Sequence, residues 1–140
     1  MGTESINWLA VLCASISAIV MGGVWYSPAL FGNSWLRENR FMVEQIRARN
    51  PIWLLLLAII FTFIMAGITG LCLATASNMQ LLKVSMTMGA LMGLVLGGIA
   101  FSGLTIVAIF EMKSVIYILI NGGYLVLSLI LMGAILGLWQ

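Results

Sequence analysis

The sequence predicts an all-α fold: a polytopic membrane protein with four transmembrane helices in two antiparallel hairpins, and a cytoplasmic amphipathic helix on the membrane surface. Of the 140 residues, 63% are hydrophobic and only 7% are charged, whereas a soluble domain carries about 25% charged residues. The mean hydropathy is +1.18, and four apolar stretches each reach the length of about 20 residues that crosses a bilayer. These stretches fill the chain, so we expect one domain over residues 1–140. The composition excludes a soluble globule, a disordered chain, a nucleic-acid binder and a disulfide scaffold.

The first two predicted spans cover residues 6–31 and 51–75, both approximately. Pro28 lacks a backbone N–H and should kink or end the first helix, and Gly32 is a natural stop. Pro28 should also deprive the Val24 carbonyl of its normal partner, which leaves a free acceptor there. Asn50 and Pro51 predict the start of the second helix, because Asn can cap free N–H groups and Pro suits the first helical position.

The third and fourth predicted spans cover about residues 81–110 and 114–139. Only residues 111–113 connect them, so the two helices should form a tight antiparallel hairpin. Ser114 is placed to cap the fourth helix.

The polar connection between the first two spans predicts an amphipathic surface helix over about residues 33–49. Its apolar residues Trp35, Met42, Val43 and Ile46 fall at helical spacing on one side, as in a helix that lies on a membrane. A solvated connector that contains some helix is the alternative. The connection also carries all four arginines of the chain, so the rule that basic loops stay inside makes this side cytoplasmic. We therefore expect an inner-membrane protein with both termini on the non-cytoplasmic side.

Each predicted span carries small residues at a four-residue repeat, which places them on one helix face. In lipid, small side chains let helix backbones approach closely. We expect a helix-packing role for them and, because they offer so much packing surface, a homo-oligomer. The stripes comprise Ala14, Ala18 and Gly22 in the first span, Ala66 and Gly70 in the second, Gly89, Gly93 and Gly97 in the third, and Gly133 and Gly137 in the fourth.

The few polar residues within the spans predict one candidate site in the cytoplasmic leaflet. Asn121 and Tyr124 share a face of the fourth span, and an Asn in hydrocarbon is costly unless it is hydrogen-bonded. Trp25, Tyr26 and Ser27 end the first span in the same leaflet. These five residues are the candidate ligand-binding set, in a pocket open toward the cytoplasm. A packing contact for Asn121, and an interfacial aromatic belt for Trp25 and Tyr26, are the structural alternatives.

Several kinds of chemistry have no residues to support them. The chain has no His and no Asp, so we expect no metal site, no cofactor and no catalytic residue, and hence no enzyme. None of the four Glu residues lies in the middle of a span. This argues against a proton-coupled antiporter of the small-multidrug-resistance type, which uses a carboxylate in its first helix.

Two stretches of the chain resemble a known family. The first contains Trp25-Tyr26-Ser27-Pro28 followed by Phe31-Gly32-Asn33-Ser34-Trp35, and the second contains Asn121-Gly122-Gly123-Tyr124. Together they resemble the bacterial membrane family catalogued as domain of unknown function 1761, over nearly the whole chain. The resemblance implies a four-helix integral membrane protein and no assigned activity. Leu125 stands where many members have a His, which removes a titratable group from that position.

Two functions fit these observations. The first is a homo-oligomeric transporter or binder of a hydrophobic or lipid-like ligand, with the lipid bilayer as its surroundings. The second is a structural or accessory subunit that packs against a membrane partner through its small-residue faces.

Overall fold

The computed structural model describes residues 6–48, 51–81 and 83–139, and confirms the predicted all-helical class. Helix accounts for 83% of the described residues, and these contain no strand. Four helices, Trp8–Trp25, Ile52–Asn78, Met86–Phe110 and Val115–Leu138, are long and apolar enough to cross a membrane. The six helices are α1 (Trp8–Trp25), α2 (Gly32–Asn39), α3 (Val43–Ala48), α4 (Pro51–Asn78), α5 (Met86–Phe110) and α6 (Val115–Leu138).

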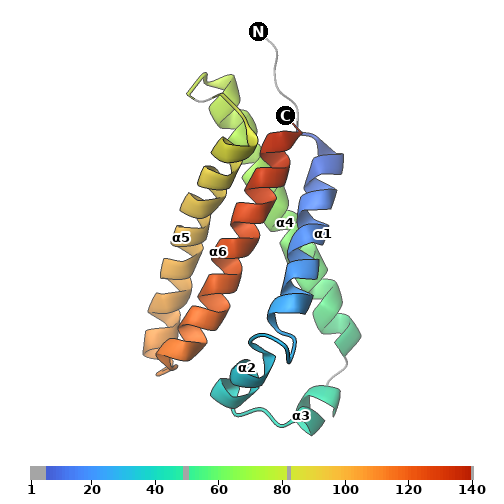
Figure 1. Cartoon of the computed structure of the whole chain (residues 1–140), viewed down its shortest axis with the longest axis vertical. Helices are drawn as coiled ribbons and strands as arrows, with labels where there is room; N and C mark the ends of the chain where they lie inside the picture. Colours follow the sequence, from blue (N-terminus) through green and yellow to red (C-terminus); the bar gives the residue numbers. More distant parts are fainter. Residues whose placement is uncertain (1–5, 49–50, 82, 140) are drawn as a thin grey trace.

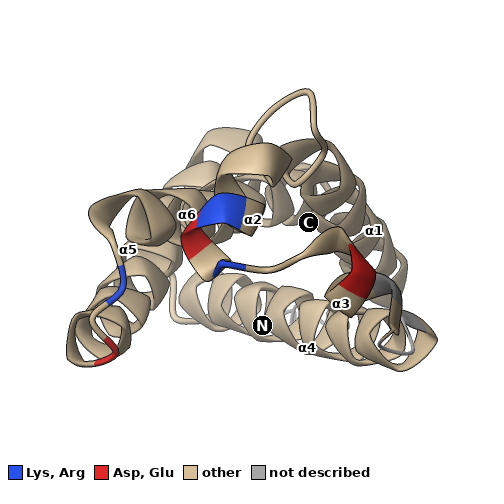
Figure 2. Ribbon diagram, turned by 90° about the horizontal axis from the view of Figure 1, so that it is seen from below, with Lys and Arg blue, Asp and Glu red and all other residues tan. Residues whose placement is uncertain are grey.

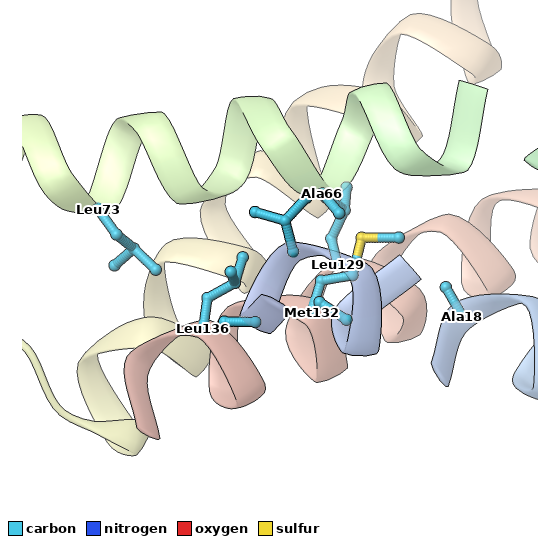
Figure 3. Close-up of a cluster of buried hydrophobic side chains, with 9 residues drawn as sticks. Ala18, Ala66, Leu73, Leu129, Met132 and Leu136 are labelled. Carbon is cyan, nitrogen blue, oxygen red and sulfur yellow. The ribbon is translucent and has the colours of Figure 1, made fainter. Parts of the chain in front are cut away.

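Helix α6 is the centre of the bundle (Figure 1). It packs along α5 as an antiparallel hairpin, and its other side contacts α1 and α4. Contacts between α4 and α5 are few by comparison. The buried core therefore lies where α1, α4 and α6 meet, around residues that include Ala66, Leu129 and Met132 (Figure 3).

The helix ends follow local hydrogen bonds that the sequence only partly indicates. The Asn7 side chain caps α1 by accepting from the N–H groups of Leu9 and Ala10 at 3.1 and 3.2 Å. Ser114 caps α6 as expected, accepting from Tyr117 N at 3.0 Å. Helix α5 begins at Met86 rather than near residue 81, because Ser85 caps it through Met88 N. The predicted cap at Asn50 lies outside the described residues.

The predicted surface helix over residues 33–49 is in fact two short helices, α2 and α3. Arg40 breaks it by adopting a left-handed conformation, with φ of 54°. The N–H groups of Arg40 and Phe41 then bond to the carbonyls of Arg37 and Leu36, which closes the end of α2. Arg49, in the predicted helix, lies outside the described residues.

The helices α5 and α6 approach each other through glycines. A Cβ atom built on Gly89 would overlap the Gly133 carbonyl oxygen, and one on Gly133 would overlap that of Gly89. A Cβ atom on Gly93 would likewise overlap the Leu129 carbonyl oxygen, and one on Gly137 would overlap the Ser85 carbonyl oxygen. We call this contact the glycine seam; in it, backbone lies against backbone.

The remaining small residues of the predicted stripes also lie inside the chain. Ala14, Ala18 and Ala66 have no exposed surface. Gly70 is buried against Leu136 and Val11, and Gly22 lies against the Tyr124 ring.

One end of the bundle carries most of the described charge (Figure 2). This charged end consists of α2, α3 and the connection between α5 and α6, and its described charged residues include Arg37, Glu38, Arg40, Glu44, Glu111 and Lys113. The Ser114 hydroxyl donates to the Glu38 carboxylate, which ties α2 to the start of α6. Lys83 precedes α5 at the opposite end of the bundle.

Candidate functional site

The turn that follows α1 positions most of the candidate residues. Helix α1 ends at Trp25, earlier than the predicted residue 31, because Pro28 offers no N–H to continue it. The chain then folds back: Phe31 N donates to Trp25 O at 3.1 Å and Gly32 N donates to Ser27 O at 2.9 Å. Gly32 is required there, since a Cβ would overlap the Tyr26 carbonyl oxygen.

The expected free acceptor at Val24 is absent, and this prediction is wrong. Ser27 supplies the donors that Pro28 lacks: its N–H lies 3.2 Å and its hydroxyl 2.7 Å from Val24 O. The Ser27 hydroxyl is thereby used within its own turn.

Trp25 makes contact with α6 instead of with an open cavity. Its indole N–H donates to the Ile120 carbonyl oxygen at 2.9 Å. The ring lies over Gly123, where a Cβ would be 3.3 Å from Trp25 Cζ2. Gly123 is therefore small because an aromatic ring from α1 occupies the space beside it.

Tyr26 and Asn121 form the polar link between α1 and α6. The Tyr26 hydroxyl donates to Asn121 Oδ1 at 2.9 Å, and Asn121 Nδ2 donates to the Tyr117 carbonyl at 2.9 Å. Burial raises the pKa of the Tyr26 phenol above its ordinary value, and Tyr124 adds to the rise. The phenol is therefore a stable donor at neutral pH.

Tyr124 completes the junction from the α6 side. Its hydroxyl donates to the Ala18 carbonyl at 3.3 Å, and its ring meets that of Tyr26 edge-on with centroids 5.4 Å apart. The ring fits because Gly22 has no side chain: a Cβ there would lie 3.2 Å from the Tyr124 hydroxyl oxygen. We call the contacts of Trp25, Tyr26, Asn121 and Tyr124 the aromatic junction.

A cavity of about 530 Å³ opens beside the junction at the charged end. Of the five predicted site residues, only Tyr26 and Asn121 line it. Its lining residues are Tyr26, Pro28, Gly32, Asn33, Trp35, Leu36, Ile46 and Asn121.

A second cavity of about 440 Å³ adjoins the first. The two share Trp35 and Ile46, and the second reaches Leu54 on α4. We call the two cavities together the groove. The lining residues that the sequence did not place at a site are Pro28, Gly32, Asn33, Leu36, Phe41, Gln45 and Leu54, together with Trp35 and Ile46, which it assigned to the apolar side of a surface helix. The apolar side of the predicted surface helix was the sequence signal that could have indicated Trp35 and Ile46 as groove residues.

The groove can hold an apolar molecule against aromatic walls. Tyr26 meets Trp35 at 5.8 Å and Trp35 meets Phe41 at 5.7 Å between ring centroids, both edge-on. Asn121 and Asn33 add amide groups at the same cavity. Such a combination, mostly apolar with a few polar groups, is typical of small-molecule sites.

Comparison with known proteins yields one match. The model of a family described as protein of unknown function (DUF1761) matches residues 9–137. No curated protein and no solved structure matches the chain.

Proposed function

Because the chain belongs to the DUF1761 family, whose description assigns no activity, we propose a function from the geometry. The protein is a multi-pass membrane protein that binds a hydrophobic or lipid-like ligand in the groove. Tyr26 and Asn121 fix the inner wall, Trp35 and Ile46 supply the apolar surface, and α2 and α3 cover the site from the charged end.

The observation that carries this proposal is the continuity of an aromatic-walled groove with the membrane-spanning part of the bundle. Both cavities share Trp35 and Ile46, and Leu54 of the spanning helix α4 lines one of them. An apolar ligand dissolved in the bilayer would meet the groove at this point.

Binding is better supported than passage across the membrane. Beyond the aromatic junction, the core between α1, α4 and α6 is filled by side chains with almost no exposed surface, among them Val11, Leu73 and Met132. A transporter would need this core to open. No described residue of the groove pairs a nucleophile with a base, so we propose a binding protein and not an enzyme.

The accessory-subunit alternative is less favoured than ligand binding. It required the small-residue stripes to face a partner, whereas Gly89, Gly133 and Ala66 are buried within this chain. The homo-oligomer stays a prediction, and the exposed apolar faces of α1, α4 and α5 are surfaces that could form it.

We also propose the orientation that the basic residues favour. Arg37, Arg40 and Lys113 belong to the charged end, while Lys83 precedes α5 at the opposite end (Figure 1). In this orientation the protein sits in the inner membrane with its charged end in the cytoplasm. Both termini would then lie on the non-cytoplasmic side.

The test measures lipid retained by the full-length protein. The protein is purified in a nonionic detergent, stripped of lipid, and incubated with equal amounts of phosphatidylethanolamine, phosphatidylglycerol and phosphatidylcholine of identical chains. Native mass spectrometry then counts bound lipid. Ile46→Trp, which puts a bulkier side chain at a position that lines both cavities, should strongly reduce the bound species, whereas Leu30→Trp, at an exposed position outside the groove, should not. Equal retention by the two variants would refute the proposal.

A further inference from the structure

We propose that the groove takes an anionic phospholipid from the surrounding bilayer, with its head group beneath α2 and one acyl chain along the first half of α4. This inference rests on the proposed function and names the class of its ligand. Four features of the molecule lead to it.

The first feature is that the first half of α4 does not pack against the rest of the bundle. Every residue from Ile52 to Phe61 is exposed, on all sides of the helix. From Thr62 onward one face is buried, at positions that include Ala66, Leu73 and Ala74. Because the exposed residues cover nearly three turns of helix, the side of α4 that faces the bundle is also open there.

The second feature is the position of the groove relative to this opening. Leu54 lies within the exposed half of α4 and lines the second cavity, which Trp35 and Ile46 join to the first. An acyl chain can therefore run from hydrocarbon, along α4, to the space beside Asn121 without crossing the buried core. Lateral entry of this kind needs no aqueous route for the apolar chain.

The third feature is the kind of polar group left unused in the groove. Asn121 Oδ1 already accepts from Tyr26, and Gln45 Oε1 already accepts from Met42 N at 3.1 Å. The indole N–H of Trp35 has no acceptor among the residues that the structure describes. Two of the amide oxygens in the groove are thus already engaged while the Trp35 donor is free, which suits a head group rich in acceptor oxygens.

Charge points to the same head group. Arg37 lies one turn after Asn33 on α2, so the two share a helix face, and Asn33 lines the groove. Within the described part of the chain neither Arg37 nor Arg40 forms an ion pair, and the nearby Glu38 carboxylate is engaged by Ser114. A guanidinium matches the geometry of a phosphate with two parallel N–H bonds.

The experiment compares phosphatidylglycerol with phosphatidylcholine of the same chains, each titrated into the stripped full-length protein in nonionic detergent. The unaltered protein should bind phosphatidylglycerol more tightly. The double variant Arg37→Gln, Arg40→Gln should lose at least about tenfold in affinity for phosphatidylglycerol and little for phosphatidylcholine, as expected for basic residues near a lipid surface. Lys83→Gln, which removes an exposed cation at the opposite end, is the matched control and should leave both affinities unchanged.

A second pair of variants tests the acyl-chain path. Leu54→Trp should weaken the binding of both lipids, whereas Ile99→Trp, on an exposed position of α5, should weaken neither. Both positions are exposed, so neither substitution disturbs the core, and helical content by circular dichroism checks folding.

The outcomes separate the two proposals. Equal affinity for the two lipids, with both weakened by Ile46→Trp, would overturn the anionic head group and keep the proposed function. An unchanged affinity in Leu54→Trp would overturn the path along α4. Binding that neither Ile46→Trp nor Leu54→Trp reduces would overturn both proposals.

Discussion

The glycine seam and the aromatic junction both depend on α6, yet they use glycine for opposite purposes. In the seam, Gly89 and Gly133 bring two backbones into direct contact. At the junction, Gly22 and Gly123 make room for the rings of Tyr124 and Trp25. The same residue type therefore closes one side of the bundle and admits large side chains, with a groove beside them, on the other.

The largest effect is expected in the seam. Gly89→Val should destabilise the protein by more than about 3 kcal/mol, because the new side chain meets a carbonyl oxygen that cannot move without the whole of α6. Unfolding by sodium dodecyl sulfate in mixed micelles measures this. Gly98→Ala is the control, since nothing lies within 4 Å of its Cβ position, and it should be neutral or slightly stabilising. Equal losses in the two variants would mean that the seam is not a special contact.

A glycine that faces a ring should behave differently from one that faces backbone. A Cβ on Gly122 would overlap the Phe101 ring of α5, so Gly122→Ala should cost about 2 kcal/mol. The second substitution Phe101→Ala should recover part of this loss, because it removes the clashing atoms. Additive losses in the double variant, measured by the same unfolding assay, would contradict a side-chain clash.

The polar link of the junction should contribute less. Tyr26→Phe removes the hydroxyl that bonds to Asn121 and should cost about 1 kcal/mol. In the background of Asn121→Leu the same substitution should cost much less, because its partner is gone. If the two losses simply add, the hydrogen bond does not stabilise the junction.

The smallest effect is expected at Ser128, on the α6 face that also carries Tyr124. Its hydroxyl is fully buried and has no hydrogen-bond partner among the described residues. Ser128→Ala should therefore raise the free energy of unfolding by up to about 1 kcal/mol. A loss of stability would reveal an additional partner, such as a buried water molecule.

Hydropathy was enough to predict the four spans, because apolar length alone decides which segments can cross a bilayer. Local chemistry also predicted the cap at Ser114 and a helix end at Pro28. The break at Arg40 could not be predicted, since its left-handed backbone carries no glycine signal. It depends on the capping bonds to Arg37 and Leu36, which any residue type can make.

The candidate site was predicted only in part. The predicted topology brought the end of the first span and the start of the fourth together, and Tyr26 and Asn121 do bond to each other. The prediction could not show that Trp25 turns toward Ile120 while Trp35 turns toward the groove. Side-chain direction after the Pro28 turn depends on how α2 folds back onto α6, which is a tertiary property.

The departure of α4 from the bundle has a consequence for how the sequence can drift. From Trp53 to Phe61 every residue is exposed, and of these Leu54 lines the groove, so the other positions should accept many apolar replacements. Past Thr62 the tolerated replacements should become small or strictly shaped at every third or fourth position. A saturation library of this helix, selected for expression, should therefore show a first half that tolerates many substitutions and a second half that tolerates few. The change between the two should fall at Thr62.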